Sequence, residues 1–176
     1  MNNKGIIFDR DGTLIEHIHY LGDPKKVRLI SPIKEILTKM KKKGFLFFLQ
    51  TNQSGVERGF YSKKDVSDCN LRMIELINLE NFFTEICISY KVNPDLCLKR
   101  KPNPNFGLSL LKKYKISKRD LYFIGDNNVD IDTALNINCN AIHVNSGKVK
   151  KESIKNNKVL FFDNVKLALT HINKFY

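Results

Sequence analysis

The sequence predicts an α/β fold of three layers, in which a Rossmann-like parallel sheet carries helices on both faces. Short unbroken apolar runs, typical of strands buried on both faces, recur along the chain. Segments with apolar residues at helical spacing separate them, and this alternation favours a parallel sheet whose chemistry lies at the carboxyl ends of its strands. The apolar runs cover residues 5–8, 45–50, 121–124 and 141–144.

Five segments carry the helical pattern. The first follows Ser31 and Pro32 and ends at Gly44, residue types favoured at the N-cap, the first turn and the C-terminus of a helix. The second has Ser62 as its candidate N-cap, followed by an apolar stripe. The remaining helices are expected over residues 105–114, 130–135 and 164–174.

Length and composition fit one globular domain, expected to span residues 1–176. With 42% apolar and 27% charged residues the chain resembles neither a disordered nor a repetitive protein. Its first apolar run is too short for a signal peptide or a membrane span, so a cytoplasmic location is expected. The four cysteines match no disulfide framework and are expected to be reduced.

The formal net charge of +12 raises the expectation of an anionic partner. The basic residues are 24 Lys and six Arg, however, whereas base and bidentate phosphate recognition favour Arg. Many of the lysines fall in predicted helix ends, around residues 41–43 and 112–115. A solvated helix surface is therefore preferred over a nucleic-acid-binding patch.

The first apolar run ends in FDRDGT, which places two carboxylates close together. Asp9 and Asp11 are two residues apart, so they can begin on the same side of a strand, and Gly12 lets the backbone turn away. Crowded carboxylates repel each other unless a cation neutralises them, and Mg²⁺ prefers oxygen ligands. An acidic turn without function is the alternative for this motif alone.

Polar residues also follow the other strands. In TNQSG, Thr51 offers a hydroxyl and Asn52 a backbone N–H to phosphoryl oxygens, and the alternative is an ordinary polar turn. In GDNNVD, Asp126 would be a third metal carboxylate and Asp130 a helix cap, and the alternative is a capping pair. Lys101, in RKP, would balance the carboxylates and hold a phosphoryl group, unless it is one more surface lysine.

Together, FDRDGT, TNQSG, RKP and GDNNVD resemble the four signature motifs of the haloacid dehalogenase superfamily, in the same order over residues 8–130. DRDGT with TNQSG and the RKP lysine is similar to the branch that contains D-glycero-D-manno-heptose 1,7-bisphosphate 7-phosphatase and histidinol-phosphate phosphatase. That branch lacks a large cap domain, and here only a helix separates the first two motifs. The resemblance implies a haloacid dehalogenase-like fold without a large cap.

The resemblance also implies roles for individual residues. Asp9 would attack phosphorus to form an aspartyl phosphate, and Asp11 would act first as general acid and then as general base. Asp9, the backbone carbonyl of Asp11 and Asp126 would hold Mg²⁺. The residues implied to contact the phosphoryl group or the rest of the substrate are Thr51, Asn52, Gln53, Ser54, Arg100, Lys101 and Asn127.

In the heptose phosphatases the first motif is followed by a substrate-binding segment that resembles DHGY. The aligned residues in this chain are HIHY. Tyr20 matches, but the acidic residue has no counterpart. We expect His17 and Tyr20 to contact the substrate. A solvated loop is the alternative for His17 and His19, and a metal-binding role is a weaker one.

Many members of the branch carry a structural zinc loop before RKP, built from a Cys-x-His pair and a Cys-x-Cys pair. The corresponding positions here hold Tyr90, Val92, Cys97 and Lys99. Even with Cys87 the segment has only two thiols, whereas structural zinc needs four ligands. We therefore predict no structural zinc and a loop over residues 87–101 held without metal. About one zinc per chain after dialysis against a weak chelator would refute this prediction.

The leading functional hypothesis is a Mg²⁺-dependent phosphatase of a small phosphorylated metabolite. The expected substrate is heptose bisphosphate, in lipopolysaccharide or other surface-carbohydrate precursor synthesis, and the expected state is a monomer without membrane attachment. Histidinol phosphate is the nearest alternative. A polynucleotide 3′-phosphatase shares similar motifs and would suit the charge, but the lysines are dispersed and no aromatic and basic platform is evident. An inactive phosphate-binding module is a remote alternative, because all the motif residues are present.

Overall fold

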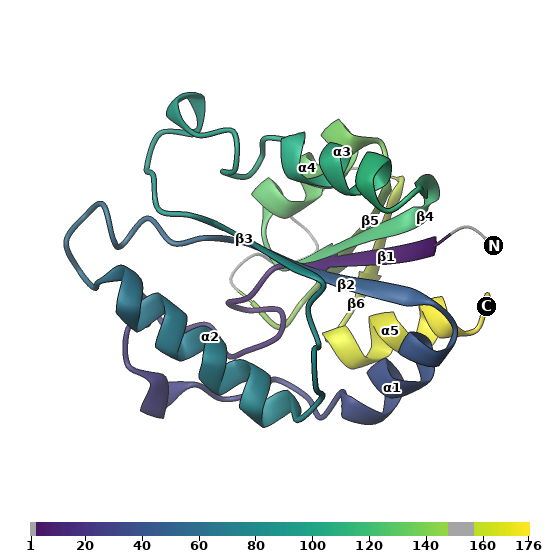
Figure 1. Cartoon of the computed structure of the whole chain (residues 1–176), viewed down its shortest axis with the longest axis horizontal. Helices are drawn as coiled ribbons and strands as arrows, with labels where there is room; N and C mark the ends of the chain where they lie inside the picture. The colour runs from purple at the N-terminus through teal and green to yellow at the C-terminus, as the bar shows by residue number, and fades with distance from the viewer. Residues whose placement is uncertain (1–2, 148–156) are drawn as a thin grey trace.

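A parallel sheet of six strands forms the middle layer of the described part of the chain, residues 3–147 and 157–176 of a computed structural model (Figure 1). In the order in which they pair, the strands are β3 (Glu85–Ser89), β2 (Phe45–Asn52), β1 (Asn3–Phe8), β4 (Ile116–Gly125), β5 (Asn140–Val144) and β6 (Val159–Phe162). Each of these pairings is parallel. The prediction of an α/β fold with a parallel sheet is confirmed.

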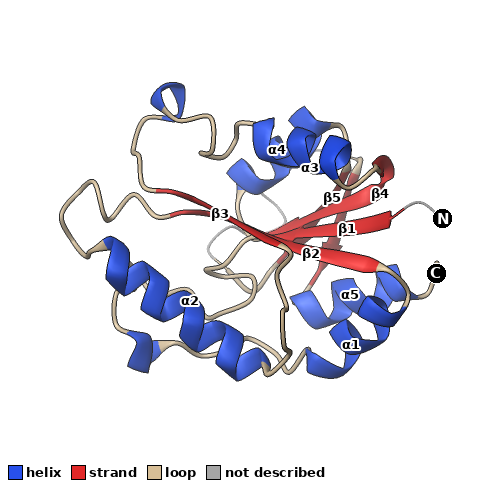
Figure 2. Ribbon diagram, in the orientation of Figure 1, coloured by secondary structure: helices blue, strands red, loops and turns tan. Residues whose placement is uncertain are grey.

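Helices cover both faces of the sheet (Figures 1 and 2). One face carries α1 (Lys34–Lys42), α2 (Lys63–Ile77) and α5 (Val165–Asn173), and the other carries α3 (Asn105–Lys113) and α4 (Asn128–Ile137). Between the first two motifs lie only the 3₁₀ helix η1 (Pro24–Lys26) and α1, so no large cap domain is inserted there. No helix in the described residues is both long and apolar enough to cross a membrane.

Two buried apolar clusters fill the spaces between the layers. Neighbouring residues of β1 belong to different clusters: Phe8 packs in the one that contains Leu37 of α1, and Ile7 in the one that contains Leu110 of α3. Successive side chains of a strand point to opposite faces, so β1 is buried on both sides. This burial explains why its sequence is an unbroken apolar run.

Two of the described strands, β3 and β6, were missing from the sequence-based prediction. They lie at the two edges of the sheet, where Ile86 is 42% and Leu160 is 43% exposed. Half-exposed edge strands lack the long apolar run of a buried strand, and a run of four residues cannot be assigned by periodicity alone. The loop predicted over residues 87–101 is corrected accordingly, because residues 87–89 complete β3 and η2 (Pro94–Leu96) forms a single turn within it.

The cap predicted for α2 is confirmed. Ser62 Oγ accepts a hydrogen bond from Asp65 N at 3.1 Å, and Asp65 Oδ2 accepts one from Ser62 N at 2.7 Å. This reciprocal pair is a capping box, which satisfies two backbone donors at the start of the helix.

The start predicted for α1 is wrong by about half a turn. The first helical carbonyl belongs to Ile33, which accepts a hydrogen bond from Leu37 N at 3.0 Å, so Ser31 lies outside the helix. Ile33 is buried in the core, which fixes where the chain enters the helix. The predicted C-terminal glycine is confirmed, since Gly44 has φ +83° and its N–H donates to Lys41 O at 3.0 Å.

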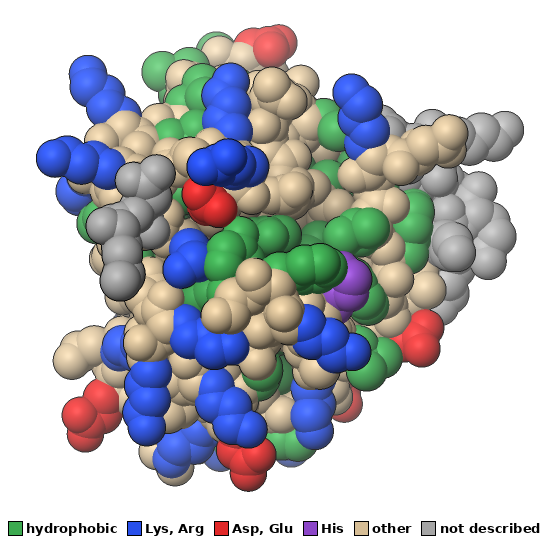
Figure 3. Space-filling view, turned by 90° about the vertical axis from the view of Figure 1, so that its right-hand side faces the viewer, with side chains coloured by type: hydrophobic (Ala, Val, Ile, Leu, Met, Phe, Trp, Pro, Cys, Tyr) green, Lys and Arg blue, Asp and Glu red, His purple; other side chains and the backbone are tan. Residues whose placement is uncertain are grey.

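Basic side chains occupy helix ends, as the sequence predicted. Lys41 and Lys42 lie in the last turn of α1, and Lys112 and Lys113 in the last turn of α3. Figure 3 shows the side of the molecule on which both chain ends lie in Figure 1, with Lys and Arg side chains spread over it. Cations at these positions interact favourably with helix C-termini.

The carboxyl ends of three neighbouring strands meet on the side of the molecule opposite to the two chain ends. Phe8, the last residue of β1, pairs with Leu49 of β2 and with Ile124 of β4. The motif residues that follow these strands are therefore delivered to one edge of the sheet, as expected for a parallel α/β fold.

Candidate active site

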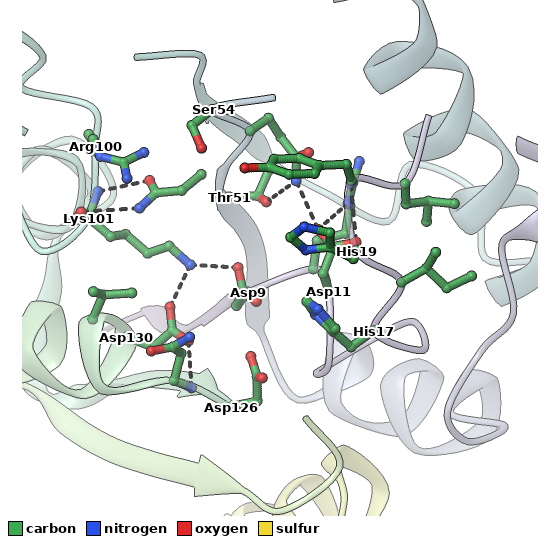
Figure 4. Close-up of a pocket in the computed structure, with 18 of the residues that line it drawn as sticks. Asp9, Asp11, His17, His19, Thr51, Ser54, Arg100, Lys101, Asp126 and Asp130 are labelled. Carbon is green, nitrogen blue, oxygen red and sulfur yellow. Dashed lines mark hydrogen bonds and ion pairs between the residues drawn. The ribbon is translucent and has the colours of Figure 1, made fainter. Parts of the chain in front are cut away.

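A cavity of about 360 Å³ opens at this edge (Figure 4). Its walls come from the loop after β1, the end of β2, the segment before α3 and the turn between β4 and α4. Every site residue predicted from the sequence lines it: Asp9, Asp11, His17, Tyr20, Thr51, Asn52, Gln53, Ser54, Arg100, Lys101, Asp126 and Asn127. The fold thus gathers residues that are more than a hundred positions apart in the chain.

Lys101 lies between two carboxylates in the middle of the cavity. Its Nζ is 2.5 Å from Asp9 Oδ1 and 2.5 Å from Asp130 Oδ1, and all three residues are buried. Burial by itself lowers the pKa of Lys101, but the charges of Asp130 and Asp9 outweigh it and raise the pKa above its usual value. Lys101 is therefore a fixed positive charge at neutral pH.

For the carboxyl groups of Asp9 and Asp130, burial outweighs the attraction of Lys101 and decides the direction of the pKa shift. Burial raises the pKa of Asp9 from its usual 3.8 to about 7, although the attraction of Lys101 opposes the shift. Burial likewise raises the pKa of Asp130, again against Lys101. One ammonium group is thus insufficient to compensate the carboxylates around it.

A third carboxylate joins this pair. Single oxygens of Asp9, Asp126 and Asp130 lie within 4.8 Å of one another, and all three residues are buried. Carboxylate oxygens are the donors that a hard cation such as Mg²⁺ prefers. The donor set therefore fits Mg²⁺, and such a cation would favour the ionised form of Asp9. Asp9 and Asp126 were predicted as Mg²⁺ ligands from the sequence, whereas Asp130, whose Oδ1 contacts Lys101, was not.

Two glycines enclose the Asp126 carboxylate. A Cβ on Gly12, whose φ is +85°, would lie 2.5 Å from Asp126 Oδ2, and a Cβ on Gly147 would overlap the same oxygen. Ser146 Oγ donates to Gly12 O at 2.8 Å and ties the two glycine turns together. On the other side, Asp126 O lies 3.1 Å from Nε2 of the buried His143. Asp126 is therefore held from both its backbone and its side chain.

Substitution of Gly147 by Ala should displace Asp126. Because the added methyl overlaps Asp126 Oδ2, we expect Mg²⁺-dependent turnover of p-nitrophenyl phosphate to fall about 10- to 100-fold, with half-saturation at higher Mg²⁺. Gly44→Ala is the control. Its Cβ would meet nothing within 4 Å, so its positive φ should cost stability but leave turnover intact. Unchanged Mg²⁺ dependence in Gly147→Ala would show that the close approach of Gly147 does not set the position of Asp126.

Asp11 lies apart from the three clustered carboxylates. Its Oδ2 accepts hydrogen bonds from Gln53 Nε2 at 2.8 Å and Arg10 Nε at 3.0 Å, and its Oδ1 accepts one from Arg10 Nη2 at 3.2 Å. Gln53 Nε2 also lies 2.8 Å from Thr51 Oγ1, and Gln53 Oε1 accepts a hydrogen bond from Tyr61 at 2.8 Å. Both oxygens of Asp11 are thus directed by neighbours.

Asn52 fixes the backbone of Lys101. Its Oδ1 accepts from Lys101 N at 3.0 Å and its Nδ2 donates to Lys101 O at 3.1 Å. Gln50 Nε2 donates to Lys99 O at 3.2 Å. The sequence had suggested only the backbone N–H of Asn52 as a phosphate donor, whereas its side chain delivers the lysine to the cavity.

Further hydrogen bonds hold the preceding segment. Glu57 accepts from Lys91 Nζ at 2.8 Å and from Val92 N at 2.5 Å, and Arg100 Nη1 donates to Lys91 O at 2.7 Å. Cys97 Sγ is 3.4 Å from Ser89 Oγ. Polar contacts with the β2–α2 connection therefore anchor this segment. The predicted absence of structural zinc stays a prediction.

The outer part of the cavity is aromatic and basic. Tyr20, which has φ +51°, packs between His19 and Phe60, with ring centroids 4.2 Å and 4.1 Å away. His17 lies deeper along the same wall, and Arg100 stands on the opposite side (Figure 4).

Sequence reasoning missed several contributors to this site. The prediction that Asp130 caps a helix is confirmed, since its Oδ2 accepts a hydrogen bond from Asn127 N at 3.1 Å, but the contact of its Oδ1 with Lys101 was not predicted. Arg10 and Gly147 carried no signal of their own. The available signal for Asp130 was its spacing, four residues after Asp126 at the start of a helix.

The sequence is similar to those of several known proteins. Residues 98–168 match the HAD-hydrolase-like protein family. D-glycero-beta-D-manno-heptose-1,7-bisphosphate 7-phosphatase of Helicobacter pylori (strain ATCC 700392 / 26695) is 30% identical over 136 residues, 76% of this chain and 79% of that protein. The histidine biosynthesis bifunctional protein HisB of Legionella pneumophila (strain Lens) is 30% identical over 145 residues, 80% of this chain. The chain spans only 41% of that relative's length.

Solved structures share the fold. D,D-heptose 1.7-bisphosphate phosphatase from B. bronchiseptica, complexed with magnesium and phosphate, superposes with a TM-score of 0.86 at 19% identity, covering 98% of this chain and 99% of that one. The enzyme of the same name from Burkholderia thailandensis has a TM-score of 0.70 at 16% identity, covering 97% of this chain and 99% of that one. At these identities the likeness establishes the architecture.

Proposed function

The chain belongs to the haloacid dehalogenase-like family and is a phosphatase of that family, and from this premise we propose that it is Mg²⁺-dependent and works through an aspartyl phosphate. We further propose D-glycero-D-manno-heptose 1,7-bisphosphate as its substrate, in surface-carbohydrate precursor synthesis, and a cytoplasmic monomer as its working form. The observation that carries the mechanism is the buried Lys101, which contacts Asp9 in a cavity that also contains Asp11 and Asp126.

The first half of the proposed reaction transfers the phosphoryl group to the enzyme. A carboxylate oxygen of Asp9 attacks phosphorus while the bond from phosphorus to the leaving oxygen breaks. Asp11 donates a proton to that oxygen, so a neutral alcohol departs. Lys101, already in contact with Asp9, neutralises charge on the phosphoryl oxygens, and Thr51 and the Asn52 backbone donate hydrogen bonds to them.

The second half frees the enzyme. A water molecule gives its proton to Asp11 and attacks phosphorus, and the bond from phosphorus to Asp9 breaks, which releases inorganic phosphate and restores the Asp9 carboxylate and the protonated Asp11 carboxyl group. Mg²⁺, held by Asp9, Asp126 and the backbone carbonyl of Asp11, would supply positive charge against which the phosphoryl group is oriented. Asp130 keeps Lys101 in place in both halves.

The outer cavity favours a substrate with a second anionic group over a cationic one. Among the described residues that line the cavity, the acidic ones are the four inner aspartates, Asp9, Asp11, Asp126 and Asp130. Histidinol phosphate carries an ammonium group, and the described residues of the outer cavity, which include His17 and His19 on one side and Arg100 on the other, offer it no carboxylate. Heptose bisphosphate carries a second phosphate, which Arg100 suits. Its guanidinium uses Nη1 on Lys91 O and keeps further N–H groups for a ligand.

A phosphate-release assay with millimolar Mg²⁺ tests the proposal on three substrates: heptose 1,7-bisphosphate, histidinol phosphate and a 3′-phosphorylated oligonucleotide. We expect turnover to be fastest on heptose bisphosphate and to vary little with salt. Preference for the oligonucleotide, with a steep loss as salt rises, would support the polynucleotide alternative instead. No release from any substrate, and no aspartyl-phosphate mimic with beryllium fluoride and Mg²⁺, would indicate an inactive binding module.

A further inference from the structure

Arg10 is a fully buried cation next to the proposed catalytic residues. It stands between Asp9 and Asp11 in sequence, its exposure is 0%, and it is among the largest fully buried side chains of the described residues. A buried charge is costly unless it is paired and hydrogen-bonded. Its partners should therefore explain why the sequence keeps an arginine here.

The guanidinium group grips the Asp11 carboxylate with two hydrogen bonds. Nε donates to Oδ2 at 3.0 Å and Nη2 donates to Oδ1 at 3.2 Å. A two-point contact fixes the plane of a carboxylate as well as its distance, and only the planar fork of arginine provides it. Lysine would supply the charge without the second hydrogen bond.

The far end of the guanidinium is itself anchored. Nη1 donates to Oδ1 of Asn70 at 3.0 Å, and Asn70 is a buried residue of α2. The Arg10 carbonyl accepts hydrogen bonds from Leu14 N at 3.0 Å and Ile15 N at 3.1 Å in the turn after β1. Arg10 therefore has a fixed backbone and a fixed tip, so it can hold Asp11 in a defined place.

We propose that Arg10 is a positioning residue, which orients Asp11 for proton transfer to the leaving oxygen and from the attacking water. The inference rests on the acid–base function proposed for Asp11. A role in stability alone does not account for the arrangement, because replacing a buried ion pair by apolar residues of similar volume is often neutral or stabilising. In addition, the carboxylate that Arg10 grips is the proposed catalytic one.

Arg10→Lys is the informative variant, because it keeps the charge and loses the fork. For an alkyl phosphate such as glycerol 3-phosphate or heptose bisphosphate, departure of the alcohol needs a proton, so kcat/KM should fall about 10- to 100-fold. For p-nitrophenyl phosphate the leaving group departs without a proton. Its first turnover in stopped flow should then keep nearly the wild-type rate, while later turnovers slow down because water activation still needs Asp11.

A variant that is merely misfolded would slow both phases with both substrates. Arg72→Met, an exposed arginine of α2 paired with Glu75, is the matched control and should behave as wild type. Asn70→Ala removes only the hydrogen bond that anchors the Arg10 guanidinium. It should lower kcat/KM for alkyl phosphates about 3- to 10-fold and slow the later turnovers of p-nitrophenyl phosphate, but not the first one. This variant tests the proposal even if Arg10→Lys does not fold. In an Asp11→Asn background, Arg10→Lys should cause no further loss of turnover.

The proposal is overturned if Arg10→Lys slows the initial and later phases of p-nitrophenyl phosphate turnover equally, or if it turns over alkyl phosphates at the wild-type rate. It is also overturned if the losses of turnover caused by Arg10→Lys and Asp11→Asn multiply in the double variant. Failure of the proposed function looks different. In that case the wild-type protein itself releases no phosphate from either substrate class and shows no initial phase, which overturns both proposals together.

Discussion

Asp9→Asn should abolish phosphate release and, without metal, make the protein more stable at pH 7.5. An amide cannot form the aspartyl phosphate, so we expect turnover to fall by at least about 10⁴-fold. The gain in stability follows from burial, which raises the pKa of Asp9 from 3.8 to about 7. At pH 7.5 the wild-type protein must therefore hold a buried carboxylate in its ionised form, whereas the variant holds a neutral group of the same shape.

The pH dependence has a defined sign. Because the folded pKa of Asp9 lies above its unfolded value, the stability that it confers is complete below about pH 4 and is lost as the pH rises through about 7. Asp130, whose pKa burial also raises, contributes in the same direction. Metal-free wild-type protein should thus be more stable at pH 5 than at pH 7.5, and Asp9→Asn should show a shallower decline.

Urea denaturation at pH 5 and pH 7.5, with and without Mg²⁺, measures this difference. Added Mg²⁺ should stabilise the wild-type protein at pH 7.5, because it binds the ionised carboxylates of the folded state, and it should stabilise Asp9→Asn less. Asp163→Asn, at an exposed position, controls for the loss of one carboxylate. If the wild-type protein and Asp9→Asn lose stability equally between the two pH values, Asp9 is not the group responsible.

Lys101→Met should lose both turnover and stability. Lys101 is the cation that contacts Asp9 and Asp130, so without it the charge on the transferring phosphoryl group is less well neutralised. We expect kcat/KM to fall about 10²- to 10³-fold, the range found when one preorganised donor is removed from an active site. We also expect the metal-free protein to lose on the order of 3 kcal/mol of unfolding free energy at pH 7.5, because buried carboxylates lose their partner.

The stability loss in Lys101→Met should be smaller at pH 5, where the carboxyl groups can take up protons. Lys99→Met is the matched control. The Lys99 side chain is exposed and the residue is held through its backbone carbonyl, so this variant should keep turnover and stability. Wild-type kcat/KM in Lys101→Met would remove Lys101 from the reaction, and an equal loss of stability at both pH values would argue against carboxylate repulsion as the cause.

The opposite signs of the two stability effects have one origin. The carboxylates of Asp9 and Asp130 share one ammonium group, that of Lys101, so removing a carboxylate relieves the imbalance and removing Lys101 increases it. A divalent cation corrects the same imbalance. The metal-free cavity therefore lowers the folding stability of the protein. The site is complete only with its metal and its phosphorylated substrate.

Sequence patterns predicted the central strands and the positions of the site residues because both depend on local regularities. An apolar run such as residues 45–50 indicates a strand buried on both faces whatever its neighbours are. The residues after such runs meet at one sheet edge in any parallel α/β fold, so Asp9, Thr51 and Asp126 could be placed together without coordinates. The edge strands β3 and β6 carry weaker patterns, since each contains one exposed and two half-buried residues.

By itself the sequence determined the fold class, the family and the residues that line the cavity, because these depend on hydrophobic periodicity and on short motifs at strand ends. Only the tertiary structure decided the partners: that Asp130 shares Lys101 with Asp9, that Arg10 turns inward to grip Asp11, and that Gly147 encloses Asp126. The physical reason is distance along the chain. Each of these contacts except that of Arg10 with Asp11 joins segments far apart in sequence, and even that one depends on an anchor sixty positions away, Asn70.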